Sequence, residues 1–265
     1  MVLIIGGLAA PVLAQNNTIT VGDLQFTIDQ NAQTAKLSGK VACPNGELVI
    51  PDHVEDDEGQ QYPVTSIGNN VFQNCQQLTS ITFPSSLTSI GEKAFNGCTR
   101  LTSVIIPSSL TNLGPLAFNG CTSITSVQYN ALDATYSHGD YGPFNGCDGI
   151  ETFTIGNDVR SIPGKLLAGT PITSIDIPTS VTSIGGSAFK NCSQLRTVYY
   201  NSRNIAQIGG AGNYVFHGCN SLETIVVGPE VERIPKYAFF DVGRLFKCRF
   251  TYRNRRFCIP RYEPC

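Results

Sequence analysis

Residues 78–98 read LTSITFPSSLTSIGEKAFNGC, and residues 101–121 read LTSVIIPSSLTNLGPLAFNGC, so one phrase returns after 23 residues. Its closing Phe-x-x-Cys element recurs along the chain, twice in degenerate form, and successive copies are 22 to 27 residues apart. The copies are Phe72/Cys75, Phe95/Cys98, Phe118/Cys121, Phe144/Cys147, Leu167/Thr170, Phe189/Cys192, Phe216/Cys219 and Phe239/Val242. A period in this range is the signature of a solenoid, in which each repeat forms one coil stacked on the next.

Each repeat contains two short apolar segments. The first follows an L-x-x-I-x-I pattern, whose β-branched residues and length favour a strand. A Pro, Gly or Asn follows, and a Pro there must end the strand because it has no N–H for a ladder. The second apolar pair, such as Leu87/Ile90, precedes a Gly and an A-F element that predict a short helical or 3-10 corner.

A single repeat cannot bury its Leu, Ile and Phe side chains, whereas stacked repeats shield them at about 1.5–3 kcal/mol per large residue. The sequence therefore predicts a β-rich solenoid of about eight coils over residues 48–250, with a parallel β-sheet along its length. The stretch VGDLQFTIDQNAQTAKLSGK (21–40) alternates around DQNAQ and predicts a hairpin. We expect residues 15–47 to form a β cap over the open edge of the first coil. The acidic DHVEDDEGQQY (52–62) is expected to be an insertion with a solvated hairpin tip.

The motif L-x-x-I-x-I-P-x-x-L-x-x-I-x-x-x-A-F-x-x-C resembles the BspA-type (Treponema pallidum-type) leucine-rich repeats. It is carried best at residues 78–98, 101–121 and 172–192, and the resemblance covers roughly residues 48–250. The resemblance implies a right-handed leucine-rich repeat superhelix. It also implies a role in adhesion or host-surface interaction, which is an analogy at the level of the fold and names no ligand.

The two ends of the chain differ from the repeats. Residues 1–14 are an apolar run ending in small residues, which predicts a signal peptide cleaved after Ala14 and a secreted or cell-surface protein. Leu245, Cys248 and Phe250 allow one more strand. Residues 251–265 then match no repeat and form a basic tail; a cap, a truncated end and an out-of-frame tail all remain open.

The composition excludes several classes of partner. Charged residues make up 14% of the chain and the formal net charge is -2, which gives no case for nucleic acid or for an anionic membrane. Nucleophile-elbow, phosphate-loop and zinc-protease motifs are all missing from the sequence. We therefore expect no enzymatic activity, no cofactor and no metal, and no membrane insertion of the mature chain.

The ten cysteines are expected to be structural. Equivalent residues of stacked coils point the same way and lie too far apart to bridge, so the six cysteines of the corners are expected to be free and buried. Cys43, Cys258 and Cys265 lie outside this series, and Cys258–Cys265 is a candidate disulfide. Zinc binding lacks paired cysteines, and a catalytic cysteine would have to use one of only three histidines: His53, His138 and His217.

A binding surface is expected where the repetition is broken. The third and fifth positions of L-x-x-I-x-I should face solvent, and most of them are Ser or Thr. The two longer coils carry tyrosines, a residue type enriched at interfaces together with Arg. The candidate partner-binding residues are Tyr129, Tyr136, His138, Tyr141, Asp176, Tyr199, Tyr200, Arg203 and Tyr214.

These features predict a non-catalytic leucine-rich repeat protein that binds a protein or glycan on another surface through its sheet face and its Tyr-rich insertions. The alternative is a structural spacer, or a truncated remnant of a larger surface protein, without a ligand of its own. Simultaneous replacement of Tyr136, Tyr141, Tyr199 and Tyr200 is expected to abolish binding and to leave thermal stability little changed.

Overall fold

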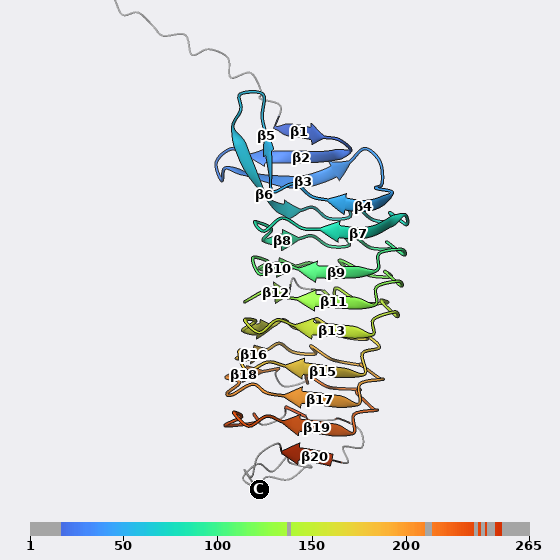
Figure 1. Cartoon of the computed structure of the whole chain (residues 1–265), viewed down its shortest axis with the longest axis vertical. Coiled ribbons are helices and arrows are strands. Elements are labelled where there is room, and N and C mark those ends of the chain that lie inside the picture. Colours follow the sequence, from blue (N-terminus) through green and yellow to red (C-terminus); the bar gives the residue numbers. More distant parts are fainter. Residues whose placement is uncertain are drawn as a thin grey trace, which may run out of the picture.

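The chain forms an elongated stack of coils beneath an antiparallel cap (Figure 1). The computed structural model describes residues 17–136, 139–209, 214–235, 238–239, 242 and 247–250. The predicted signal peptide (1–14) and the basic tail (251–265), with Cys258 and Cys265, lie outside the described residues.

One side of the stack is formed by the first strand of each coil. These strands are β4 (Gly46–Val49), β7 (Leu78–Thr82), β9 (Ser103–Ile106), β11 (Ser126–Tyr129), β13 (Thr152–Ile155), β15 (Ser174–Ile177), β17 (Thr197–Tyr200), β19 (Thr224–Val227) and β20 (Lys247–Phe250). They pair in parallel and in register within three groups, β4-β7, β9-β11-β13 and β15-β17-β19-β20. The predicted parallel sheet is confirmed, with two interruptions.

A second sheet is formed by the short apolar pairs. Its strands are β6 (Gln61–Ile67), β8 (Ser89–Ile90), β10 (Asn112–Leu113), β12 (Thr135–Tyr136), β14 (Ser161–Ile162), β16 (Ser183–Ile184) and β18 (Gln207–Ile208). They pair in parallel in two groups, β6-β8-β10-β12 and β14-β16-β18, and no pairing joins β12 to β14 among the described residues. The coils approach closely just after β8 and β10, where a Cβ on Gly114 would lie 2.5 Å from the carbonyl carbon of Gly91. Only glycine allows this approach.

The corners are not helical, which corrects the predicted helical or 3-10 corners: the described residues contain no helix. Alternate corner N–H groups donate to the next coil, as from Phe72 to Ala94 O (2.7 Å) and from Phe95 to Ala117 O (2.7 Å). The N–H groups between them donate within their own turn, as from Cys98 to Phe95 O (3.2 Å). A helix would direct all these donors along its own axis, so the ladder between coils requires a series of turns instead.

The core runs the length of the stack. The first residue of each of the eight Phe-x-x-Cys copies, a Phe or Leu167, is buried, and these eight positions bound seven complete turns. The rings of Phe72, Phe95, Phe118 and Phe144 stack at centroid distances of 5.2 Å, and those of Phe189, Phe216 and Phe239 at 4.9 and 5.1 Å. Leu167 separates the two stacks. The prediction that each coil is shielded by its neighbours is therefore confirmed.

The N-terminal cap consists of β1 (Thr18–Val21), β2 (Leu24–Asp29) and β3 (Thr34–Lys40) in antiparallel order, as predicted. In its turn the Asp29 carboxylate accepts hydrogen bonds from the N–H groups of Asn31 and Ala32, both at 3.0 Å. Strand β3 pairs in parallel with β6 and so covers the first coil. The acidic insertion forms a hairpin of β5 (His53–Glu55) with the start of β6 and projects beside the cap (Figure 1).

Candidate partner-binding face

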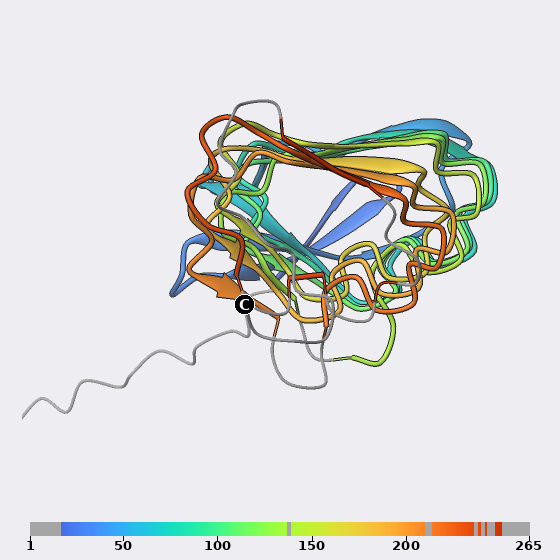
Figure 2. The same cartoon turned by 90° about the horizontal axis from the view of Figure 1, so that it is seen from below.

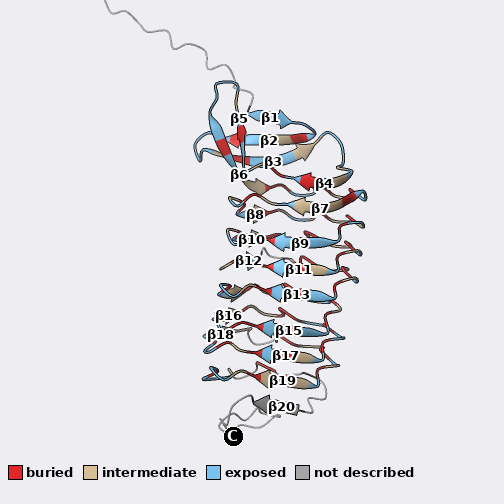
Figure 3. Ribbon diagram, in the orientation of Figure 1, coloured by how far each residue is buried: buried red, intermediate tan, exposed pale blue. Residues whose placement is uncertain are grey.

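Side chains alternate between core and solvent along the strands of the long sheet (Figure 3). The outward positions form two rows across successive coils. The first row consists of Ser80, Ser103, Ser126, Thr152, Ser174, Thr197 and Thr224. The second row consists of Val49, Thr82, Ile105, Gln128, Thr154, Asp176, Tyr199 and Val226. From β7 to β19 the first row is hydroxyl throughout, whereas the second row changes chemistry from coil to coil.

Exposed apolar side chains concentrate on the second row. Of the six large hydrophobic side chains that are exposed among the described residues, Val49, Ile105 and Tyr199 belong to it. Ile105 is 58% exposed and Tyr199 is 43% exposed. Burial in the core does not account for apolar groups at these outward positions, which makes the second row the candidate contact surface of the sheet.

Asp176 and Tyr199 are direct neighbours on this row, since β15 and β17 align them across the sheet. Both side chains are exposed. The amide Nδ2 of Asn201 donates a hydrogen bond of 2.8 Å to the Asp176 carboxylate and orients it. The structure thus brings together two of the residues predicted from the sequence.

The long sheet is interrupted between β13 and β15, where no strand pairing is present among the described residues. At neighbouring joints the residue after the strand closes the ladder: Asn130 N donates to Ile106 O at 3.1 Å, and Asn201 N donates to Ile177 O at 3.0 Å. After β15 this position is Pro178, which has no N–H to offer Ile155 O. The interruption between β7 and β9 coincides with Pro107 in the same way.

A groove of about 570 Å³ lies at the joint between β13 and β15. Its lining includes Thr152 and Thr154 of β13, Ser174 and Asp176 of β15, and Tyr199 of β17. The groove therefore contains the Asp176–Tyr199 pair. Sequence reasoning missed it, although a proline directly after a strand was a usable signal.

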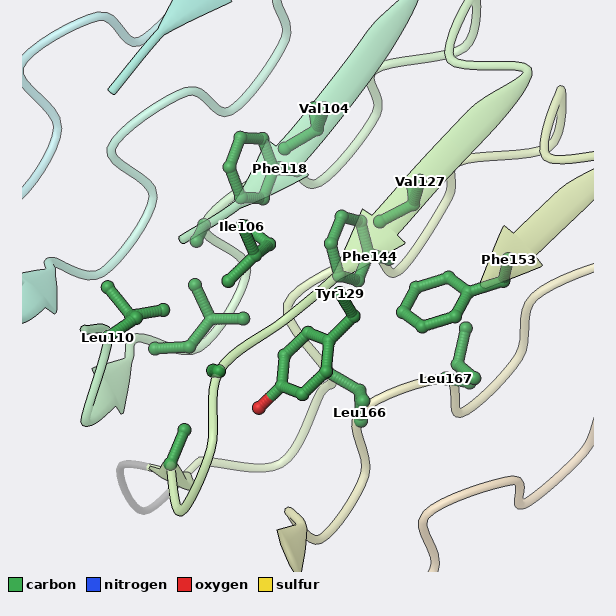
Figure 4. Close-up of a cluster of buried hydrophobic side chains, with 14 of the residues drawn as sticks. Val104, Ile106, Leu110, Phe118, Val127, Tyr129, Phe144, Phe153, Leu166 and Leu167 are labelled. Carbon is green, nitrogen blue, oxygen red and sulfur yellow. The ribbon is translucent and has the colours of Figure 1, made fainter. Parts of the chain in front are cut away.

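Tyr129 and Tyr200 do not belong to any surface, which corrects their choice as candidates. Each is the last inward-facing residue of its strand, where other coils carry Ile106, Ile155 or Ile177, and both are fully buried. Figure 4 shows the Tyr129 ring directed into the core among apolar side chains. Each lies within one of the two longer coils, between Cys121 and Cys147 or between Cys192 and Cys219. A variant that removes Tyr200 would therefore lose stability, contrary to the expectation of little change.

The phenol groups of these two tyrosines are unusual. Neither Tyr129 Oη nor Tyr200 Oη has a hydrogen-bond partner within the described part of the chain. Burial raises the pKa of both phenols above the ordinary value, because the charged form would lose its hydration. Tyr129 and Tyr200 are therefore core residues, each with a buried phenol oxygen that is not hydrogen-bonded within the described residues.

The other candidates lie on different parts of the coil. Tyr141 is 58% exposed, and Tyr214 is half-buried. Arg203 is exposed, and its Nε lies 2.7 Å from Glu232 Oε1 of the next coil. The backbone of Tyr136 belongs to β12, and His138 lies outside the described residues.

The candidates do not converge on one site. Viewed along the stack, the segment that follows residue 138 projects on the side of the coil away from the long strands (Figure 2). Asp176 and Tyr199 therefore share one face, while Tyr141 belongs to another. The sheet face and the insertion must be tested separately.

The corner cysteines form a ladder of thiols, and no disulfide joins two of them. Each of five buried thiols donates to the carbonyl of the corner residue in the preceding coil: Cys98 to Phe72, Cys121 to Phe95, Cys147 to Phe118, Cys192 to Leu167 and Cys219 to Phe189, at 3.0 to 3.2 Å. This hydrogen bond explains why cysteine recurs there, beyond its size.

Cys75 is the exception, and it corrects the prediction that all six corner cysteines are free. It is disulfide-bonded to Cys43, with a Cα–Cα distance of 5.2 Å. Cys75 lies in the first corner, so no preceding corner supplies a carbonyl for its thiol, and the connection after β3 supplies Cys43 instead. The bond ties the cap to the first coil.

The described residues contain no cluster of three or more His, Cys, Asp or Glu side chains positioned to hold a metal ion. They also contain no helix of the length and apolarity that crossing a bilayer requires.

Comparison with known proteins places these features in a family. The BspA type leucine rich repeat region, in six copies, matches residues 60–139 and 139–246. The chain belongs to the BspA-type leucine-rich repeat family. The corner thiols, the Phe stacks and the two parallel sheets described above are thus features of a BspA-type solenoid.

Solved structures of similar proteins include three bacterial leucine-rich repeat proteins. One from Bacteroides capillosus is 30% identical, with a TM-score of 0.47, covering 53% of this chain and 99% of its own. The Treponema pallidum leucine-rich repeat protein is 19% identical, with a TM-score of 0.50, covering 78% and 80%. A leucine-rich cell surface protein from Faecalibacterium prausnitzii is 21% identical, with a TM-score of 0.44, covering 89% and 95%. No curated protein matches this chain in sequence.

Proposed function

We propose that this BspA-type solenoid is a non-catalytic, secreted or cell-surface protein that binds a protein or glycan on another surface. The observation that carries the proposal is the contrast between the two outward rows of the long sheet. The first row keeps hydroxyls in every coil from β7 to β19, while the second row varies and exposes Ile105 and Tyr199. A spacer without a ligand has no need for varied, exposed apolar side chains on one row alone.

Two observations support location outside the cytoplasm. The Cys43–Cys75 disulfide persists in oxidising compartments and would be reduced in an ordinary cytosol. The N-terminal run MVLIIGGLAAPVLA has the apolar segment and the small residues before Gln15 that are typical of a cleaved export signal.

The test uses residues 15–265 against a panel of immobilised matrix proteins and mucin glycoproteins, measured by biolayer interferometry. A row variant carries Ile105→Ser, Gln128→Ser and Tyr199→Ser, which give the second row the chemistry of the first. An insertion variant carries Tyr141→Ser and Arg203→Ser. All five side chains are exposed, so both variants should fold and retain their thermal midpoint.

The expected result is saturable binding of at least one panel member, weakened about tenfold or more by the row variant. Weakening by the insertion variant alone would move the contact surface to the insertions. Failure of the intact chain to bind any panel member would favour the spacer.

A further inference from the structure

The interruption between β13 and β15 is the place where the sheet face becomes concave. The groove has a volume of about 570 Å³, within the range of small-ligand sites, which is roughly 300–1,000 Å³. It runs beside strands of four residues each, and so over about 13 Å of extended backbone. It is long and open, as a site for part of a chain-like ligand must be.

The polar groups of the groove are both donors and acceptors. Hydroxyls come from Thr152, Thr154, Ser174 and Thr179, and amides come from Asn157 and Asn201. A hydroxyl or an amide can donate and accept at once. A ligand that carries many hydroxyl groups can pair with both the donors and the acceptors of the groove. An ammonium or guanidinium group can only donate, so it would pair with the acceptors of the groove alone.

The charges of the groove exclude an acidic ligand. Glu151 and Asp176 line it, and no lysine or arginine is present among its described lining residues. Asp176 is held by Asn201 Nδ2 at 2.8 Å, so one carboxylate oxygen is oriented while the other can accept a hydrogen bond. An anion would meet two carboxylates without a compensating cation.

Tyr199 supplies an aromatic group on the wall of the groove. Its side chain is 43% exposed and lies directly opposite Asp176 on the neighbouring strand. An exposed ring beside an oriented carboxylate offers both an apolar contact and a hydrogen-bond acceptor. Sugar rings present C–H faces and hydroxyl edges, which are the complementary groups.

We propose that the groove between β13 and β15 binds a neutral oligosaccharide, with Tyr199 contacting a sugar face and Asp176 and Asn201 bonding its hydroxyls. This proposal rests on the proposed function and specifies its ligand class. A cationic peptide segment is the competing occupant, because Glu151 and Asp176 would attract it and Tyr199 would contact its cation. The predominance of neutral donor–acceptor groups favours the oligosaccharide.

The experiment measures binding of residues 15–265 to a panel of free neutral oligosaccharides built from glucose, galactose, mannose or N-acetylglucosamine, by isothermal titration calorimetry. Sialylated oligosaccharides and oligolysine serve as the acidic and cationic alternatives. Tyr199→Ser tests the ring. Asp176→Asn keeps the size of the side chain and an acceptor for Asn201 while removing the charge. Val41→Ser is the control, because Val41 is exposed and lies outside both the groove lining and the second row.

We expect at least one neutral oligosaccharide to bind, with an affinity weakened about tenfold or more by Tyr199→Ser and unchanged by Val41→Ser. The affinity should not change between about 0.05 and 0.5 M salt, because no charge pair forms with the ligand. No neutral oligosaccharide binding, equal binding by the Tyr199→Ser variant, or binding only of oligolysine that disappears at high salt would each overturn the assignment.

Failure of this proposal can be told apart from failure of the proposed function. If the row variant loses binding to a panel protein while no oligosaccharide binds, the sheet face is a protein-binding surface and the groove assignment is wrong. If neither probe class binds, both proposals fail.

Discussion

The Cys43–Cys75 disulfide gives the most quantitative prediction. Replacing Cys43 by Ala removes the bond with little other change, because Cys43 is exposed and Cys75 becomes one more buried thiol in its series. The bond closes a loop with a sequence separation of 32 residues. Restriction of the unfolded chain by a loop of this size stabilises the folded state by about 3.7 kcal/mol at 25 °C in the chain-entropy description. We expect a loss of about 2–4 kcal/mol.

The loss should be local, because in a solenoid each coil contacts only its neighbours. Urea denaturation would measure the free energy of unfolding, and hydrogen exchange would locate the change. Exchange should accelerate in β2, β3 and the first coil and stay unchanged in β15, β17 and β19. Cys121→Ser, which replaces a buried thiol without breaking a disulfide, is the control. An unchanged free energy in the Cys43→Ala variant, or faster exchange spread over the whole stack, would refute the reasoning.

Two other predictions concern the core. Leu167, which is smaller than the Phe residues of the stacks on either side, lies beside Phe153 in the core (Figure 4). Phe153 occupies the position at which β9 and β11 carry Val104 and Val127. Leu167→Phe should therefore destabilise the protein by about 1–3 kcal/mol through overpacking, and Phe153→Val in the same chain should relieve this; additive effects in urea denaturation would contradict it. Burial raises the folded-state pKa of Tyr129 and Tyr200, so above the unfolded pKa of about 10 the unfolded chain loses these protons first. The ionisation of these phenols therefore does not affect stability below about pH 10, and above it each phenol lowers the free energy of unfolding by up to about 1.4 kcal/mol per pH unit. Tyr129→Phe should reduce this slope and cost little or no stability at pH 7, since Oη has no partner among the described residues. Urea unfolding and phenolate absorbance at several pH values would measure the slope, and an equal slope in the wild-type and variant proteins would contradict the prediction.

Most of the fold could be predicted because the repeats of this chain can be aligned with one another. Eight copies of one phrase show which positions tolerate change, and the inward Phe, Leu and Ile of each copy are buried as the period requires. The geometry of the corners could not be predicted from one copy. Whether A-F-x-x-C forms a helix or a series of turns depends on where its N–H groups find acceptors, and those lie in the next coil.

The candidate site was predicted only in part. Asp176 and Tyr199 were found because they break the Ser/Thr pattern, and the structure places them side by side. Tyr129 and Tyr200 were misplaced because the longer coils suggested surface insertions, whereas both occupy the inward position at which other strands carry Ile106, Ile155 or Ile177. The Cys43–Cys75 bond could not be predicted from the spacing of equivalent cysteines, because the first coil has no preceding corner and Cys75 pairs with a cysteine outside the series.

The central claim is that the second outward row is the surface that meets a partner, and methyl NMR tests it within single strands. Ile105 points outward and Ile106 points inward on β9, and Val226 and Val227 do the same on β19. During titration with a matrix protein that the intact chain binds, the methyl signals of Ile105 and Val226 should shift saturably while those of Ile106 and Val227 stay in place. Saturable binding that leaves Ile105 and Val226 unmoved would contradict the account.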